Sequence, residues 1–439
     1  MGSRLSAPGP REKRFAAYME GLANAAGHAD RHTPLKNYCT GLLLPGERKS
    51  IEPMAARLAP HDVRRMHQSL HHLVADAPWN DTAMLERVRQ QVFTMQKQDP
   101  VVAWIVDDTG FPKQGKHSVG VARQYCGQVG KQDNCQVAVS LSVSTWSSSL
   151  PVAWKLYLPE AWCQDSERRQ QAGVPEEIEF QTKPEIALEQ IQQALEQKIP
   201  VGVVLADAGY GNGTPFRAAI SQLGLQYTVG IESSTTVWEP GQHPLPAPSR
   251  KPGRGAPPKR LQRNRDHQPI SVKQLAFGLS SSAWKDVAWR QGSQKTLRSR
   301  FAAVRVRPAH RDYKRTEPHP EEWLLIEWPK KESEPTKYWL STMPEKTSLK
   351  PLVKMAKHRW IIERDYEELK QELGLGHYEG RGWRGFHHHA TLCIAAYGFL
   401  VSERNRFSPS ARAGHVGLRV AQTPRDFRPR GSPHTPRAA

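Results

Sequence analysis

Residues 101–108 (VVAWIVDD) and 201–207 (VGVVLAD) are two apolar runs that each end in aspartate. A continuous apolar run of this length is typical of a strand buried on both faces of a sheet. We therefore expect two such strands, the first closed by Asp107 and Asp108 and the second closed by Asp207. If these strands are neighbours, their carboxylates lie near one another.

The elements around these runs follow a definite order. Thr182 with Glu185 forms a capping-box pattern, while Thr214 is the expected cap of a shorter helix and Gly224 its end. The predicted elements after the first strand are strands over 136–143 and 151–158, a helix from Thr182 to Pro200, the strand before Asp207, a helix from Thr214 to Gly224, and a strand over 226–231. This order is that of the α/β ribonuclease-H-like fold, a mixed sheet with flanking helices.

The rest of the chain has three further kinds of pattern. Apolar residues at helical spacing dominate the N-terminal part, strand-like runs fill the stretch before a long helix predicted from about Ser348 to Leu373, and the end is rich in arginine. We therefore predict a helical N-terminal DNA-binding domain over 1–95, a ribonuclease-H-like catalytic domain over 96–235 and 345–402, a β-rich insertion with a basic, proline-rich loop over 236–344, and a disordered Arg-rich tail over 403–439.

A third carboxylate is expected on the long helix. Arg359, Glu363 and Lys370 lie there at spacings of four and seven residues, which places them on one helix face. Carboxylates gathered from strands and a helix suit Mg²⁺, which prefers hard oxygen ligands. Cations beside such a site suit phosphate groups.

These motifs resemble those of bacterial insertion-sequence transposases of the DDE class. The resemblance rests on WIVDDTG at 104–110, LADAGY at 205–210, and the Arg-x3-Glu-x6-Lys pattern that begins at Arg359, and it covers roughly residues 15–400. The family pattern on the last helix is Tyr-x2-Arg-x3-Glu-x6-Lys, with a β-rich insertion before it. This chain has Ala356 where the family has tyrosine, and its Arg/Pro-rich tail is not an expected feature.

The resemblance implies the roles of particular residues. It assigns Asp108 rather than Asp107 as the first carboxylate, which with Asp207 and Glu363 would hold two Mg²⁺ or Mn²⁺ ions for in-line phosphoryl transfer. The residues expected to bind DNA phosphates are Arg359 and Lys370, with Lys113 and Lys116 as weaker candidates. Two tryptophans of the insertion, Trp289 and Trp323, are candidates for stacking on a displaced base.

Charge and cysteine content point to the partner and the compartment. The 62 Lys and Arg residues exceed the 43 Asp and Glu residues by 19, which favours a polyanionic partner. By resemblance this partner is double-stranded DNA, both element ends and target, bound by a homodimer. Five scattered cysteines, without a secretory signal or a membrane-length apolar run, predict a cytoplasmic protein associated with the nucleoid.

Four alternatives to this interpretation have to be weighed. One is a catalytically inactive or domesticated DNA-binding protein derived from such a transposase, which a single sequence does not exclude. A phosphatase that uses Asp107 and Asp108 is disfavoured, because adjacent strand residues face opposite sides. Metal binding by His387–His389 with His377 is disfavoured, because adjacent helix residues point in different directions. Zinc binding by Cys126 and Cys135 is also disfavoured, since no second cysteine pair accompanies them.

Overall fold

The structure is a computed structural model that describes residues 9–94, 99–248, 259–292 and 294–407. Its strands are β1 (Ala103–Pro112), β2 (Ala122–Cys126), β3 (Lys131–Ser144), β4 (Ser149–Leu156), β5 (Val203–Ala206), β6 (Tyr227–Ile231), β7 (Thr236–Trp238), β8 (Ile270–Ser271), β9 (Lys285–Gln291), β10 (Thr296–Pro308), β11 (Glu322–Glu327) and β12 (Lys337–Ser341).

The helices begin before the first strand and continue to the end of the described chain. They are α1 (Pro10–Ala23), α2 (His32–Leu43), α3 (Ile51–Leu58), α4 (Val63–His71), α5 (Asp81–Thr94), α6 (Glu160–Cys163), α7 (Ser166–Ala172), α8 (Lys183–Glu196), α9 (Ala208–Gly211), α10 (Thr214–Gln222), α11 (Val272–Gly278), α12 (Leu349–His358), α13 (Trp360–Glu367) and α14 (Trp383–Phe407). Within the described residues, no helix is both long and apolar enough to span a membrane.

A mixed sheet organises the molecule. In the described chain, its strands run in the order β2-β3-β1-β5-β6-β12-β11-β10-β7-β8, with β4 paired to β3 and β9 paired to β10. Strands β1, β5 and β6 are parallel neighbours, while β3 is antiparallel to β1. The predicted α/β fold, a ribonuclease-H-like mixed sheet with flanking helices after a helical N-terminal region, is confirmed.

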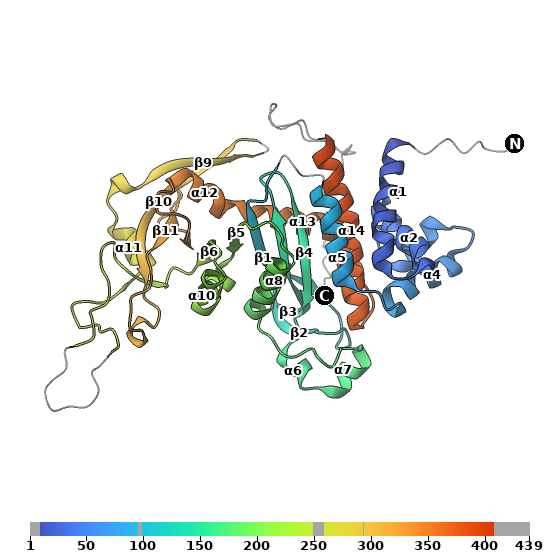
Figure 1. Cartoon of the computed structure of the whole chain (residues 1–439), viewed down its shortest axis with the longest axis horizontal. Coiled ribbons are helices and arrows are strands. Elements are labelled where there is room, and N and C mark those ends of the chain that lie inside the picture. The colour runs from blue at the N-terminus through green and yellow to red at the C-terminus, as the bar shows by residue number, and fades with distance from the viewer. Residues whose placement is uncertain (1–8, 95–98, 249–258, 293, 408–439) are drawn as a thin grey trace, which may run out of the picture.

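The two faces of β1 contact different layers. Ile105 belongs to the hydrophobic cluster that includes Ile362 of α13 and Leu392 of α14, whereas Val106 belongs to the cluster that includes Ile186 of α8. Figure 1 shows the insertion strands β9–β11 at one end of the molecule and the N-terminal helices at the other. Residues that alternate along β1 therefore face either α13 or α8.

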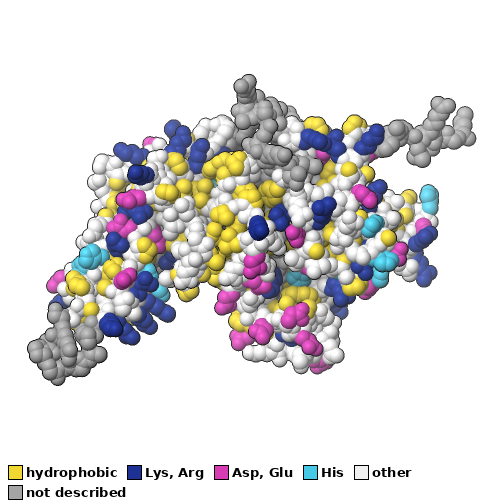
Figure 2. All heavy atoms as spheres, viewed as in Figure 1, with side chains coloured by type: hydrophobic (Ala, Val, Ile, Leu, Met, Phe, Trp, Pro, Cys, Tyr) yellow, Lys and Arg dark blue, Asp and Glu magenta, His cyan; other side chains and the backbone are white. Residues whose placement is uncertain are grey.

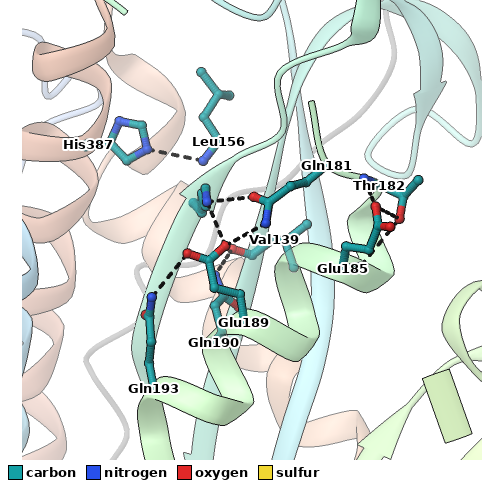
Figure 3. A network of polar contacts seen from close by, with 10 residues as sticks. Val139, Leu156, Gln181, Thr182, Glu185, Glu189, Gln190, Gln193 and His387 are labelled. Carbon is teal, nitrogen blue, oxygen red and sulfur yellow. Dashed lines mark hydrogen bonds and ion pairs between the residues drawn. The ribbon is translucent and has the colours of Figure 1, made fainter. Parts of the chain in front are cut away.

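Helix α8 is fixed against the sheet by polar contacts as well as apolar ones (Figure 3). The predicted capping box is present, because Thr182 and Glu185 exchange side-chain and backbone hydrogen bonds. Further along, the Nζ atom of Lys155 lies 2.8 Å from Glu189 Oε2, and the side-chain amide of Gln190 donates to the carbonyl of Val139 at 3.1 Å. These contacts hold the middle of α8 against β3 and β4.

Two sequence predictions about strand and helix ends were wrong. Strand β1 does not close at Asp107 and Asp108 but continues to Pro112, because its pairing with β3 persists to Cys135. Its parallel pairing with β5 ends at Ile105, so the aspartates still follow the parallel part of the sheet. Thr214 is the first residue of α10 rather than its cap, since its hydroxyl accepts a bond from Arg217 instead of capping the helix.

The long helix expected from Ser348 to Leu373 is interrupted. Helix α12 ends at His358 and α13 begins at Trp360, with a π-helical turn, η6 (Glu368–Glu372), before the left-handed residue Gly374. At the interruption, the imidazole of His358 lies 3.1 Å from the hydroxyl of Ser144, and Arg359 reaches Asp107. The break coincides with two consecutive side chains that contact the central strands.

The predicted tail and basic loop are partly ordered. Helix α14 continues to Phe407, and Arg404 forms a 2.6 Å ion pair with Glu368, so a disordered tail does not begin at residue 403. In the basic loop, Arg263 forms an ion pair with the buried side chain of Asp312. The predictions for 249–258 and 408–439 fall outside the described residues. Strand β2, which extends the β3 edge, was not predicted.

Candidate active site

Asp107 lies on the face of β1 that packs against α13. Its Oδ2 atom is 2.7 Å from Nη1 of Arg359, and only 14% of its side chain is exposed. Burial raises the pKa of Asp107 to about 7, and the nearby carboxylates of Asp207 and Asp108 add to this shift, while Arg359 opposes it. Asp107 is therefore an acid held close to other acids, with Arg359 as its counter-ion.

Asp108 faces the opposite layer. Its Oδ2 atom accepts a hydrogen bond from Nζ of Lys183 at 3.1 Å and one from the hydroxyl of Tyr210 at 3.3 Å. These partners come from α8 and α9. The structure thus brings Asp107, and not the sequence-predicted Asp108, into contact with Arg359.

Asp207 follows β5 and begins α9. Its Oδ1 atom accepts the backbone N–H of Gly209 at 2.9 Å, so it serves as the helix cap. Gly211, in the same helix, has no room for a side chain, because an added Cβ would meet the carbonyl of Gly230. This close approach fixes the turn that carries Asp207 beside β6.

Arg359 contacts two of the three carboxylates. In addition to its contact with Asp107, its Nη2 atom lies 3.7 Å from Oε1 of Glu363. Burial acts to lower the pKa of Arg359, but the charges of Asp107, Asp207 and Glu363 raise it overall. The guanidinium group therefore neutralises a cluster of acids from β1, the end of β5 and α13.

A cavity of about 470 Å³ opens beside this cluster. Asp207, Arg359 and Glu363 line it together with residues from β6, β9, β12 and α12. Its wall on the insertion side includes Trp289 and Arg290, and Ala356, where the resembling family has tyrosine, also lines it. The cavity thus joins two predicted carboxylates to cationic and aromatic side chains.

The donor chemistry of this cluster fits a divalent cation. Asp107, Asp207 and Glu363 offer only hard carboxylate oxygens. In the described part of the chain, no three metal-binding side chains stand close enough to hold an ion as they are placed. Glu363 has 70% of its side chain exposed and lies 3.7 Å from Arg359, which supplies the positive charge beside these acids.

The three lysines predicted to bind DNA phosphates lie outside the lining of the carboxylate cavity. Nζ of Lys370 donates to the carbonyl of Gly110 at 2.7 Å, and burial lowers its pKa to about 8. Lys113 donates to the carbonyl of Tyr378 at 2.7 Å, and burial lowers its pKa as well. Lys116 is exposed and borders a separate groove. None of the three belongs to the lining of the carboxylate cavity.

The two candidate tryptophans differ in position. Trp289 lines the cavity, and Nζ of Lys357 lies 4.8 Å from the centre of its ring. Trp323 donates its indole N–H to the carbonyl of Pro344 at 3.1 Å and lies beneath the guanidinium of Arg305. Stacking on a displaced base stays a prediction, and the geometry favours Trp289.

The histidines and cysteines considered above for metal binding contact backbone groups or apolar side chains in the described chain. His387, His388 and His389 are buried, and each lies within hydrogen-bonding distance of backbone groups. His377 accepts the backbone N–H of Lys49 at 3.0 Å. Cys126 and Cys135 pack in a small hydrophobic cluster.

Sequence reasoning missed two residues of this site, Arg290 and Trp360. The guanidinium carbon of Arg290 lies 3.4 Å from the ring centre of Trp360. The sequence offers only a weak signal for this contact. Arg290 is one of many basic residues in the insertion, and the pattern around Trp360 predicts a core residue of the helix.

A comparison with protein families decides the classification. The family model described as DDE superfamily endonuclease matches residues 21–296, well over half of the chain. The chain belongs to this family. The matched part of this DDE superfamily endonuclease contains Asp107, Asp108 and Asp207, and α13 with Glu363 follows it. Enzymes of the superfamily generally use divalent metal ions.

A curated relative is similar over part of its length. The probable transposase for insertion sequence element IS701 of Microchaete diplosiphon is 33% identical over 168 residues. The match covers 38% of this DDE superfamily endonuclease and 41% of the relative, so the chain spans about two fifths of that protein.

Proposed function

We propose that the chain is a transposase that cleaves DNA at the ends of its mobile element and joins the freed 3′ ends to target DNA. The proposal rests on Arg359, which lies 2.7 Å from Asp107 and 3.7 Å from Glu363 and lines one open cavity with Asp207 and Glu363, in a chain of the DDE endonuclease family. The name of the partly matching relative, a probable transposase, supports this choice among nucleases.

The carboxylates have distinct roles in this proposal. Asp107, Asp207 and Glu363 would hold the divalent cations, with Asp107 in the place expected for Asp108, because Asp107 faces Arg359 and α13. Asp108 instead ties α8 and α9 to β1 through Lys183 and Tyr210. Two bound Mg²⁺ or Mn²⁺ ions would supply activation of the attacking oxygen and stabilisation of the leaving oxygen.

The cationic side chains position the DNA strand. Arg359 would bind a phosphate of the strand, because its planar guanidinium can donate two parallel N–H bonds to phosphate oxygens. Lys370, anchored to the carbonyl of Gly110, reinforces β1 just beyond the aspartates. Lys113 and Lys116 contribute at most to the wider DNA path.

DNA is the partner in this proposal, and the protein acts at the nucleoid as a homodimer that pairs two element ends. The excess of 19 positive charges supports binding through phosphate contacts. A second candidate, a DNA-binding protein without catalytic activity, is favoured by Ala356 in the place of the family tyrosine. The two candidates differ in cleavage and not in binding.

Cleavage of a defined plasmid tests the proposal. The plasmid carries the coding segment with its native flanking DNA, and the purified chain is incubated with it in Mg²⁺ or Mn²⁺. We expect nicks that map to the flanks and that disappear in EDTA, in Asp207→Asn and in Glu363→Gln. Glu367→Gln, which changes an exposed acid on the same helix, serves as the matched control and retains cleavage.

The opposite results have clear meanings. If the wild-type protein binds this DNA but leaves it intact, the non-catalytic candidate is correct. If the Asp207→Asn and Glu363→Gln variants cleave as well as the wild type, the catalytic site lies elsewhere in the chain.

A further inference from the structure

Arg290 brings a positive charge from the insertion to the catalytic helix. It belongs to β9, and its guanidinium carbon lies 3.4 Å above the ring centre of Trp360, the first residue of α13. The same arginine lines the cavity that contains Asp207 and Glu363. Arg290 is thus the point where β9 meets the helix that carries a proposed metal ligand.

The charge of Arg290 is incompletely paired. Within the described residues, its buried Nε atom has no hydrogen-bond partner, and no ion pair to its guanidinium is present. Burial lowers the pKa of Arg290, and the neighbouring charge of Arg364 lowers it further, while Glu363 acts in the opposite direction. A partly buried cation beside a like charge is unfavourable unless an anion approaches it.

Trp360 has two cations around it. The guanidinium carbon of Arg364 lies 5.5 Å from its ring centre, in addition to Arg290 at 3.4 Å. Arg364 has a distant acidic neighbour, with its Nε atom 4.0 Å from Glu368. Stacking fixes the plane of the Arg290 guanidinium without using its N–H groups. A stacked guanidinium therefore keeps donors available at its edge.

We propose that Arg290, held in place by Trp360, binds a phosphate of the DNA strand that enters the cavity. The inference rests on the proposed function and adds to it a substrate contact made by the insertion. The ligand class is a phosphodiester, because a guanidinium edge matches two phosphate oxygens and the anion offsets the charge that Arg290 and Arg364 place together.

A purely structural role would have a different signature. If Arg290 served only to hold β9 against α13, its replacement would lower the melting temperature and leave the salt dependence of DNA engagement unchanged. A phosphate contact instead contributes one released counterion, which changes the salt slope by about 0.9. The two roles are therefore separable in one experiment.

The experiment measures nicking of the flank-bearing plasmid in Mn²⁺ against protein concentration, at several salt concentrations. For Arg290→Gln we expect the half-saturating protein concentration to rise about tenfold, and its logarithmic salt slope to fall by about 0.9. Arg290→Lys should keep the slope, because the charge remains, but recover only part of the affinity. Arg298→Gln, an exposed arginine of the paired strand β10, is the matched control and should change the half-saturating concentration less than twofold.

The results for the Arg290 and Asp207 variants distinguish the phosphate contact from a structural role of Arg290 and from failure of the proposed function. An unchanged half-saturating concentration and slope for Arg290→Gln, with cleavage still abolished in Asp207→Asn, overturns this inference and leaves the proposed function standing. Cleavage that persists in Asp207→Asn refutes the proposed function instead. A lowered melting temperature for both Arg290 variants, with the wild-type salt slope in both, assigns Arg290 a structural role.

Discussion

Asp107 and Asp108 are adjacent in the sequence but have opposite surroundings. Asp107 meets Arg359 of the break before α13, whereas Asp108 meets Lys183 of α8. The alternation of a strand predicts that the two side chains diverge. It does not tell which layer lies on which side, because this depends on the packing of α8 and α13, whose contacting residues are 75 and 252 positions away. The sequence therefore located the pair but not the member that faces α13.

Exchange of each aspartate for asparagine separates the two roles. Asp107→Asn should lower metal-dependent plasmid nicking by roughly a hundredfold or more, because it removes one ligand of a shared cation site. Asp108→Asn should retain most of the nicking rate, since it removes a contact to Lys183 and Tyr210. Rates under single-turnover conditions check this. Inactive Asp108→Asn beside active Asp107→Asn would restore the assignment that the sequence alone favoured.

Arg359 should act as the internal counter-ion of the metal-free protein. Arg359→Gln leaves Asp107 buried beside other acids without its partner, so we expect the unfolding free energy in EDTA to fall by about 3 kcal/mol. Mn²⁺ should raise the melting temperature of this variant more than that of the wild type, because a cation replaces the lost charge. Chemical and thermal denaturation measure both effects.

A matched control for Arg359 is an ion pair on the surface. Arg48 pairs with Glu379, and both side chains are more than 60% exposed. Arg48→Gln should change stability by less than about 1 kcal/mol and should not alter the response to Mn²⁺. Equal responses of the two variants would show that Arg359 is not a counter-ion of a cation site.

At the scale of elements, the predicted order of strands and helices agrees with the structure, but several predicted boundaries differ from the observed ones. The helix expected as one piece from Ser348 to Leu373 is broken at Arg359, a position without proline or glycine to mark it. Contacts to the central strands accompany the break, and local sequence carries no information about them. Strand β1 runs past its aspartates for a related reason, since its partner β3 is longer than the apolar pattern indicates.

Helix α14 contains a buried histidine that should make stability depend on pH. Nδ1 of His389 accepts a hydrogen bond from the hydroxyl of Tyr38 at 2.8 Å, and its Nε2–H donates one to the carbonyl of Gly374. Burial lowers the pKa of His389 from 6.5 to about 4. Below pH 6.5 the unfolded chain binds more protons, so stability falls as the pH drops from 6.5 toward 4, by about 1.4 kcal/mol per pH unit for one histidine.

Urea denaturation at pH 7 and pH 5 checks this dependence. His389→Asn should be less stable than the wild type at pH 7 but should lose less stability on acidification. His28→Gln, which changes an exposed histidine, should keep the wild-type dependence. An identical loss on acidification in the wild type and in His389→Asn would contradict the assignment.

At the scale of the whole molecule, charge is unevenly distributed. Figure 2 shows Asp and Glu side chains gathered over the α6–α7 region, while Lys and Arg side chains are frequent over the insertion. Composition alone predicts a polyanionic partner from the net charge of +19, but it does not place the cations. The contact of Arg290 with Trp360 joins β9 of the insertion to α13, which no local pattern reveals.

The C-terminal segment provides a test of unspecific attraction to DNA. Residues 408–439 contain six arginines and one aspartate, and their composition predicts contacts with phosphate. Deletion of these residues should weaken binding to flank and random duplexes by similar factors and flatten the logarithmic salt slope by about 0.9 per lost contact. Fluorescence anisotropy measures both. An unchanged slope would mean that the segment does not contact DNA, and a loss limited to flank DNA would mean that it reads sequence.

Recovery of joined DNA tests whether the chain is a transposase. A donor plasmid that carries the coding segment with its native flanks is mixed with a target plasmid, the purified chain and Mg²⁺, and junctions between the two are sequenced. We expect junctions with constant element ends and varied target positions for the wild type and Glu367→Gln, and none for Asp207→Asn. Absence of junctions with the wild type in both Mg²⁺ and Mn²⁺, or equal numbers with Asp207→Asn, would contradict the proposed function.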